Sequence, residues 1–181
     1  MGDEEGALDT YELISNDDRA NRKILRKVIH LLKKRHETDS VWVFLKRLHR
    51  LYPNRNSITI EYANLLMEKT EYREARDLYE PIAEQYDPDE TNEDAKIARL
   101  HKAECMLQLG YTRAAHKIFR GLVRDDNKFK EAFDGLAIAT MKLGKRGEAE
   151  KASKKAANLE KSEFLRDAIE PERIEGMQLT P

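Results

Sequence analysis

The sequence predicts an all-α protein, a right-handed α-solenoid of about four helix–turn–helix repeats with a short C-terminal capping helix. Three observations support this prediction: a pair of alanines twelve residues apart occurs three times, further residues follow each pair at fixed distances, and the copies recur with a regular period. A small residue at such a position lets two antiparallel helices cross closely, because interiors are tightly packed. The three copies are Ala63, Ala75, Tyr79 and Ile82; Ala103, Ala115, Phe119 and Leu122; and Ala137, Ala149, Ser153 and Ala156.

The period of these copies is that of a helical repeat protein. Ala115 and Ala149 are 34 residues apart, whereas Ala75 and Ala115 are 40 apart, which is the same period plus an insertion of six residues. A repeat of this length indicates one supersecondary unit that buries its apolar face only by stacking on its neighbours. The composition agrees, since 40% hydrophobic and 37% charged residues with 7% aromatic ones suit a thin helical core under a large wet surface.

These residues resemble the signature of the tetratricopeptide repeat family, whose unit is a helix–turn–helix of about 34 residues. The resemblance implies a solenoid over residues 17–169. It names no partner, because one fold of this kind hosts many unrelated functions. The four units that it implies are 22–55, 56–89, 96–129 and 130–163, with an insertion at 90–95.

Two units depart from the family pattern. The first unit is degenerate, with Ile29 and Val41 at the positions of the alanines. In the second unit Thr70 stands where the third and fourth have Gly110 and Gly144. Glycine suits this turn between paired helices because it adopts positive φ without steric cost.

Capping and breaking residues predict where the helices begin and end. Asp17 is a suitable N-cap for the first helix, and the second helix ends before Pro53, which cannot continue it. Residues 91–94 have the spacing of a capping box, so we expect the fifth helix to begin ahead of its unit and to run to Leu109. The expected helices are 17–35, 40–52, 57–69, 72–86, 91–109, 112–124, 128–143 and 146–159, followed by a capping helix at 162–169.

Charge is distributed along the chain in blocks. Residues 1–18 carry seven acids and no Lys or Arg, and residues 19–55 carry twelve Lys or Arg against two acids. Residues 56–95 hold twelve acids and three bases, and residues 96–181 hold eighteen bases and thirteen acids. One interpretation is a set of solvated helix faces, with the acidic N-terminal segment against the basic first unit. The other is a partner or anion site on that basic unit.

By resemblance, a partner groove lies on the first helix of each pair. This groove is expected to be basic at the first unit, apolar in the middle and acidic at the far end. Its apolar members either contact a partner or pack against a neighbouring unit, and we expect Leu100→Ala to leave the fold intact. The expected groove residues are Lys23, Arg26, His30 and Lys33; Ser57, Ile60, Asn64 and Met67; Ile97, Leu100, Glu104 and Leu107; and Glu131, Asp134, Ile138 and Met141.

The sequence predicts a non-catalytic module that binds a protein or peptide partner. The alternatives are a scaffolding domain of a larger signalling or regulatory protein, a self-association module that forms a homodimer, and nucleic-acid or anion binding by the first unit. In that unit Trp42 lies near Lys46 and Arg47, but a net charge of −1 argues against nucleic acid. The carboxylate clamp of some family members is not expected, because His30 and Glu61 occupy the positions of its asparagines.

No residue constellation points to catalysis, a cofactor or a metal site. The five histidines show no metal-ligand spacing, and the single cysteine, Cys105, lies in an apolar stretch and is expected to be buried and inert. The N-terminus has no secretory signal, and no apolar run reaches the roughly 20 residues that span a bilayer. We therefore expect a cytoplasmic protein without enzymatic activity, with residues 1–16 and 170–181 as flexible segments.

Overall fold

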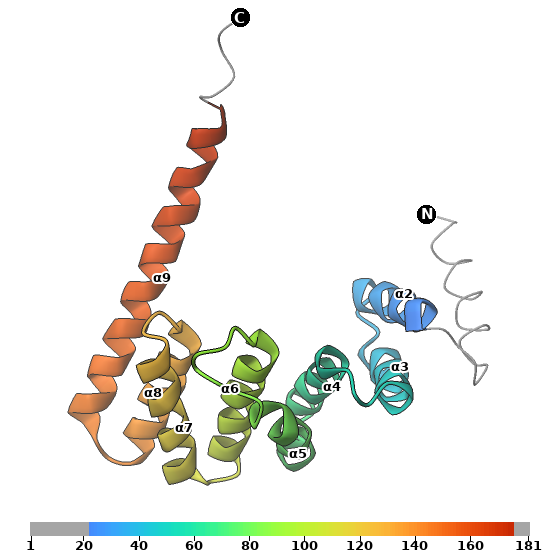
Figure 1. Cartoon of the computed structure of the whole chain (residues 1–181), viewed down its shortest axis with the longest axis horizontal. Coiled ribbons are helices and arrows are strands. Elements are labelled where there is room, and N and C mark those ends of the chain that lie inside the picture. The colour runs from blue at the N-terminus through green and yellow to red at the C-terminus, as the bar shows by residue number, and fades with distance from the viewer. Residues whose placement is uncertain (1–21, 176–181) are drawn as a thin grey trace, which may run out of the picture.

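The computed structural model describes the backbone of residues 22–175 and the side chains of residues 22–161. Within this range the chain forms eight α-helices and no strand (Figure 1). The expected N-cap Asp17, the segment 1–16 and the residues after Glu175 lie outside the described residues. The helices are α2 Arg22–Lys34, α3 Thr38–Leu51, α4 Asn56–Glu68, α5 Tyr72–Ala83, α6 Glu93–Gln108, α7 Thr112–Asp125, α8 Lys130–Lys142 and α9 Arg146–Glu175.

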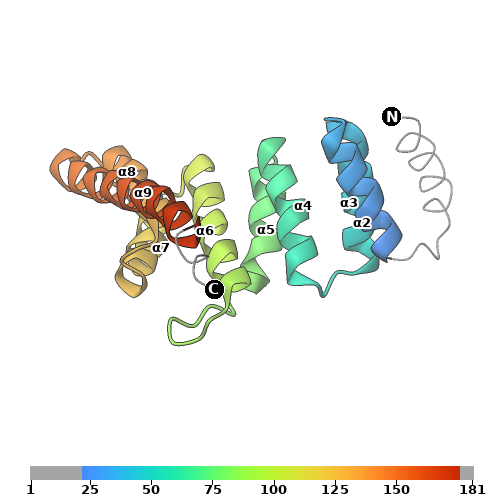
Figure 2. The same ribbon diagram turned by 90° about the horizontal axis from the view of Figure 1, so that it is seen from above.

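The helices form four pairs that stack side by side along one direction (Figures 1 and 2). Each helix contacts the next one along the chain, and α6 also contacts the first helices of the neighbouring pairs, α4 and α8. This arrangement confirms the predicted all-α solenoid. The bounds of α3 to α8 lie within three residues of the expected ones, which is the usual uncertainty of helix ends.

The turn inside each pair contains one residue with left-handed backbone. These residues are His36, Thr70, Gly110 and Gly144, with φ of 58°, 63°, 86° and 79°. They recur at the repeat spacing, so the degenerate first unit keeps the register of the others. In each turn the next residue donates its backbone N–H to a carbonyl five residues back, as from Glu71 to Leu66, which ends the first helix of the pair.

The left-handed turn predicts the effect of two opposite substitutions. Thr70→Gly should stabilise the fold by up to about 1 kcal/mol. A β-branched residue in this conformation costs roughly 1–2 kcal/mol, and the substitution removes that cost. Glycine loses more conformational entropy on folding than threonine, which offsets part of the gain. Gly110→Ala should destabilise the fold by about 1 kcal/mol, because of the same steric cost. Urea unfolding of both variants against the wild type measures the two changes. A loss of stability in Thr70→Gly would contradict the strain.

The alanines of the repeat lie where the helices cross. Ala63 and Ala103 on the first helices, and Ala75 and Ala115 on the second helices, are completely buried. Ala149 is 2% exposed, whereas its pair member Ala137 is only half-buried. The last pair is therefore less completely covered than the two before it.

At each junction between the last three pairs, a large side chain on the second helix of one pair packs against the first helix of the following pair. Tyr79 and Phe119 are completely buried at equivalent positions of α5 and α7. The Tyr79 ring lies 5.6 Å from the ring of His101 on α6, and Phe119 lies against Gly135 on α8. A Cβ atom at Gly135 would come within 2.3 Å of Phe119 Cε1, so the absence of a side chain is what lets α8 approach.

Two glycines inside helices should respond oppositely to alanine. Gly135→Ala should destabilise the protein by about 1–3 kcal/mol, because the added methyl group overpacks the buried Phe119 ring. Gly147→Ala should stabilise it by about 0.5–1 kcal/mol, because its Cβ meets no atom within 4 Å and alanine favours a helix. Thermal unfolding of the pair checks both signs, and equal effects would contradict the close approach at Gly135.

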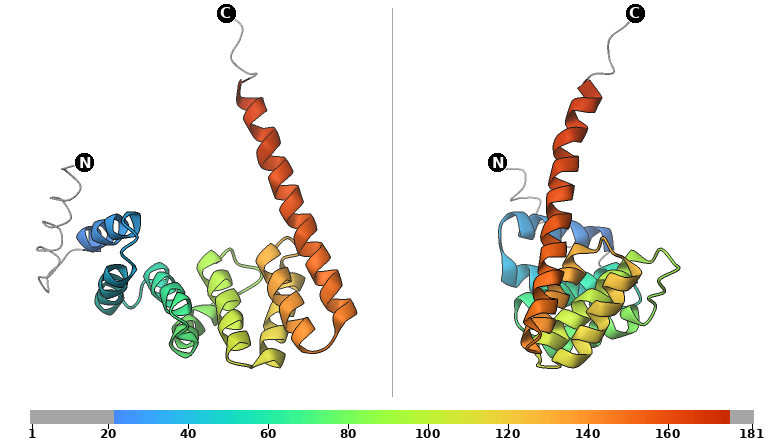
Figure 3. Two further views of the ribbon diagram at one scale, coloured as in Figure 1. Left: turned by 180° about the vertical axis from the view of Figure 1, so that it is seen from behind. Right: turned by 90° about the vertical axis from the view of Figure 1, so that its left-hand side faces the viewer.

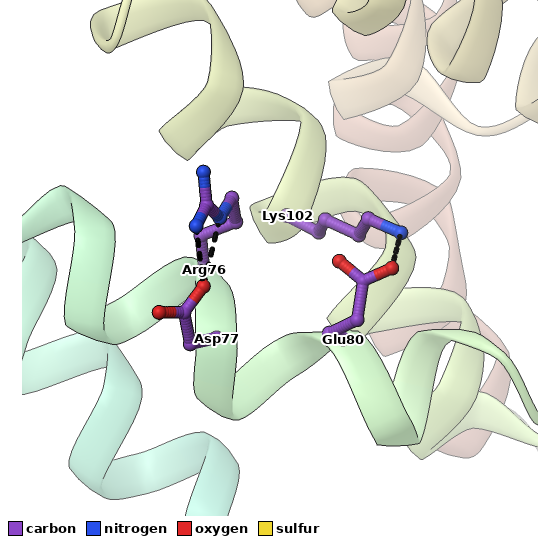
Figure 4. A network of polar contacts seen from close by, with 4 residues as sticks. All are labelled: Arg76, Asp77, Glu80 and Lys102. Atoms are coloured by element: carbon purple, nitrogen blue, oxygen red, sulfur yellow. Dashed lines mark hydrogen bonds and ion pairs between the residues drawn. The ribbon is translucent and has the colours of Figure 1, made fainter.

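Ion pairs add to the junction between the second and third pairs (Figure 4). Lys102 Nζ on α6 lies 2.6 Å from Glu80 Oε1 on α5, while Arg76 donates two hydrogen bonds to Asp77 within α5, at 2.6 and 2.9 Å.

The inserted residues lead into α6, which begins ahead of its unit, as expected. The expected capping box is wrong by one residue: Asn92, not Thr91, is the N-cap, and its side chain accepts a hydrogen bond from the Ala95 N–H at 3.0 Å.

The last helix differs from the prediction. α9 runs without interruption from Arg146 to Glu175 and includes the residues expected to form a separate capping helix (Figures 1 and 3). The stretch 159–169 contains no glycine or proline, the two residues that most disfavour the interior of a helix. The expected break after residue 159 is therefore absent, and the helix also extends into the segment 170–181 that was expected to be flexible.

Candidate partner-binding groove

A groove of about 610 Å³ crosses the first helices of the second, third and fourth pairs. It contains six of the residues that the sequence places in the partner groove: Met67, Glu104, Leu107, Glu131, Asp134 and Ile138. These residues come from α4, α6 and α8, which lie side by side because each pair repeats the one before it. The other residues that line it are Glu68, Tyr72, Gln108, Phe119, Gly135 and Lys142.

The groove combines an apolar floor with an acidic rim. Carboxylates line it from three helices: Glu68 on α4, Glu104 on α6, and Glu131 and Asp134 on α8, against one cation, Lys142. Glu68 and Glu131 are exposed and have no ion-pair partner among the described residues. The floor is made by methionine, aromatic and aliphatic side chains of the same three pairs. Such a surface favours a ligand that carries positive charge beside apolar groups.

Two of the four carboxylates are held in place by neighbouring side chains. Glu104 Oε2 lies 2.7 Å from His101 Nδ1, one turn away on α6, and Lys130 Nζ donates to Asp134 Oδ2 at 3.0 Å on α8. The carboxylate of Asp134 raises the pKa of the Lys130 ammonium through that hydrogen bond. The rim therefore has two fixed carboxylates and two, Glu68 and Glu131, that remain available to a ligand.

Three of the expected groove residues are core residues instead. Ile60, Leu100 and Leu107 are only 8%, 4% and 5% exposed, because the neighbouring pairs pack over them. The sequence left two roles open for the apolar groove residues, contact with a partner or packing against a neighbouring unit. At these three positions the structure shows packing against a neighbouring unit. Leu107 still touches the groove from below, whereas Ile138 is 52% exposed and Met141 48%.

The burial of Leu100 reverses the expectation that its truncation spares the fold. Leu100→Ala should destabilise the protein by about 2–5 kcal/mol, because it removes three buried carbon atoms and leaves a cavity. Asn64→Ala, at a half-buried position, should cost less. Urea unfolding of the two variants measures the difference. Equal stability of Leu100→Ala and the wild type would show that Leu100 does not belong to the core.

Two cations of the basic first unit pair with one carboxylate of the second unit. Arg26 Nη1 and Lys33 Nζ on α2 lie 2.8 and 2.6 Å from the two oxygens of Glu61 on α4. Lys33 and Glu61 also line a second groove, of about 410 Å³, between the first and second units. Arg26 and Lys33, both expected at the basic end of the groove, are therefore engaged within the chain.

The other two groove residues of the first unit, Lys23 and His30, are exposed on α2. Lys23 lines a separate cavity of about 470 Å³ near the start of α2, together with Arg22, Arg26, Lys27 and Arg55. This cavity lies away from the acidic groove and shares no lining residue with it. The structure therefore does not bring all the expected groove residues into one continuous site.

Asn64 is oriented by the second helix of its own pair. The Tyr79 hydroxyl donates to Asn64 Oδ1 and lies 3.5 Å from Met67 Sδ. Burial raises the pKa of the Tyr79 phenol above its usual range, so the hydroxyl remains a donor at every physiological pH. Asn64 also lines the second groove.

Cys105 and Trp42 behave as structural residues. Cys105 is completely buried, and this burial, with Glu104 beside it, raises the pKa of its thiol to about 12, so the thiol stays protonated and unreactive. Trp42 is partly buried against the core of the first two pairs, with Lys46 Nζ 4.6 Å and Lys69 Nζ 5.9 Å from its ring centroid. No cluster of metal-ligating side chains occurs among the residues described, and none of the described helices could cross a membrane.

Sequence reasoning missed the groove residues that lie outside the four family positions. Tyr72 and Phe119 belong to second helices, and Glu68, Gln108 and Lys142 lie at the ends of first helices. Apart from the count of twelve acids in residues 56–95, the sequence holds no signal that places them in one groove. Their proximity follows from the stacking of the pairs.

These features define a helical-repeat protein with the tetratricopeptide type of fold. No protein-family model and no curated protein sequence matches the chain. Solved structures of MamA share its fold. A crystal structure of MamA superimposes with a TM-score of 0.69 at 18% identity, over 90% of this chain and 92% of that one. The structure of MamA from Desulfovibrio magneticus RS-1 also superimposes with a TM-score of 0.69, at 14% sequence identity. The match covers 89% of this chain and 88% of that one.

Proposed function

We propose that this chain is a non-catalytic interaction module that binds a basic segment of a protein partner in the acidic groove over α4, α6 and α8. The observation that carries the proposal is the acidic rim above an apolar floor, contributed by three successive pairs. Apolar side chains of the partner would provide affinity on the floor, and its Lys or Arg side chains would set orientation and association rate at the rim.

The groove suits a short helix or an extended peptide. Its volume of about 610 Å³ accommodates a few side chains rather than a whole domain. Met67 and Tyr72 offer apolar contacts at one end and Ile138 at the other. The fixed carboxylate of Glu104 comes from α6 between them, and that of Asp134 from α8, the helix that carries Ile138. A partner with one or two apolar anchors flanked by basic residues would satisfy both kinds of contact.

Two observations favour this groove over the basic first unit as the main site. The cavity at the start of α2 is lined by five cations, but Ile58 is its only apolar residue. Arg26, one of those cations, is already paired with Glu61. The acidic groove, in contrast, offers both exposed carboxylates and apolar area, which a peptide ligand needs for specificity and affinity.

Reversal of the rim charge tests the proposal. Selection of binders from a random peptide library should enrich apolar residues flanked by Lys or Arg when the wild-type chain is the target. The double variant Glu68→Lys/Glu131→Lys should lose those peptides, with affinity reduced by at least tenfold, because the rim then repels them. The affinity of the wild type should also fall as salt is added, since exposed charges are screened.

The matched control is Glu84→Lys/Glu90→Lys, which makes the same change in net charge at exposed positions outside the groove. This control should retain the wild-type peptides and their affinity. Selected peptides without a basic bias, or equal binding by both double variants, would overturn the proposal. Circular dichroism confirms that each variant keeps its helices.

A further inference from the structure

The outer end of the last pair carries an open apolar groove. It has a volume of about 490 Å³ and lies between α8 and α9. Ile138 and Met141 on α8 are 52% and 48% exposed, and Ser153 on α9 is exposed beside them. Lys142 and Lys154 flank the groove, with Glu150 as the acidic residue of its lining.

The repeat register shows what this groove lacks. Leu107 and Phe119 in the third pair occupy the positions of Met141 and Ser153 in the fourth, 34 residues later. Leu107 is 5% exposed and Phe119 completely buried, because α8 packs over them. No described helix takes the equivalent place against α8 and α9. The fourth pair therefore has an uncovered apolar surface against which one more helix could pack.

The end of α9 projects away from the other helices that the structure describes. Beyond Lys161, α9 continues to Glu175, roughly 20 Å further at the rise of an α-helix. Figures 1 and 3 show this part projecting away from the other helices, and α8 is the one described helix that α9 contacts. Because α9 is continuous from Arg146 to Glu175, this segment does not fold back onto its own pair.

The projecting segment and the open groove have complementary sequences. Residues 142–155 around the groove carry six Lys or Arg and two acids, whereas residues 162–175 carry five acids and two Arg. The same segment contains the apolar residues Phe164, Leu165 and Ile169, of which Leu165 and Ile169 have the i,i+4 spacing of one helix face. An acidic helix with an apolar stripe is the ligand that the open groove with its basic border would accept.

We propose that residues 162–175 of one copy occupy the groove between α8 and α9 of a second copy, and that the exchange is reciprocal. Two straight α9 helices running antiparallel achieve this with a two-fold axis near Asn158, which brings residue 165 of each copy beside residue 150 of the other. Such a contact is isologous and closes as a dimer. Residues 162–175 of each copy then cover the open end of the other copy's solenoid.

Light scattering of the full chain during size-exclusion chromatography tests the dimer. The wild type should have the mass of two chains, and Met141→Asp should shift it to one, because a buried carboxylate in the groove opposes docking. Phe164→Asp should have the same effect from the other side of the contact. Val43→Asp is the control: Val43 is 55% exposed on α3, outside the proposed contact, so this variant should stay dimeric.

Disulfide trapping tests which chain supplies the segment. The single variants Ser153→Cys and Ser162→Cys, mixed under mild oxidation, should form a mixed disulfide between two chains. The native Cys105 does not compete, because it is completely buried. The wild type under the same oxidant controls for this.

A monomeric wild type at every concentration would overturn the proposal, as would dimers that survive both Asp variants. A disulfide that forms only within the double variant Ser153→Cys/Ser162→Cys, and never between the mixed single variants, would show that the segment caps its own chain. The groove variants of α4 and α8 at Glu68 and Glu131 should leave the dimer intact. The dimer and the peptide groove can therefore fail independently.

Discussion

The packing of a large side chain from one pair of helices against the first helix of the next pair is the interaction on which the rest of this structure depends. Phe119 meets Gly135 and Tyr79 meets His101, at equivalent positions of the repeat. These contacts set the spacing of α4, α6 and α8, because packed interiors leave no room for adjustment. The acidic groove exists only because three first helices lie at that spacing, so interior packing determines the site.

The first helices therefore serve two purposes at once. Some of their side chains, such as Leu100, are buried between pairs, whereas Asp134 and Ile138, further along the stack, reach the surface. Whether a side chain of a first helix is buried or exposed depends on the direction in which it leaves the helix. It also depends on the neighbouring pair, so equivalent positions differ in burial from one pair to the next. The exposed apolar residues of α8 illustrate this, since the last pair lacks the neighbour that covers the equivalent Leu107.

Much of the fold could be predicted from the chain, but less of the site. The recurring alanines and the 34-residue spacing identified the pairs, and the turn residues placed their boundaries. The family positions supplied six of the residues in the acidic groove. They did not distinguish buried Ile60 from exposed Ile138, because exposure depends on what the adjacent pair presents. They also did not reveal that Arg26 and Lys33 share Glu61, a contact between residues more than 25 positions apart.

The sequence by itself determined the repeat register, the helical class and the left-handed turns at Gly110 and Gly144, because each depends on local spacing and backbone preference. Thr70 takes the same turn conformation although its side chain does not favour it, so the repeat outweighs local preference at that position. Only the tertiary structure decided which apolar residues are core and which carboxylates meet across three helices. These features depend on contacts between residues distant in the chain, where the packing of neighbouring units overrides local preference.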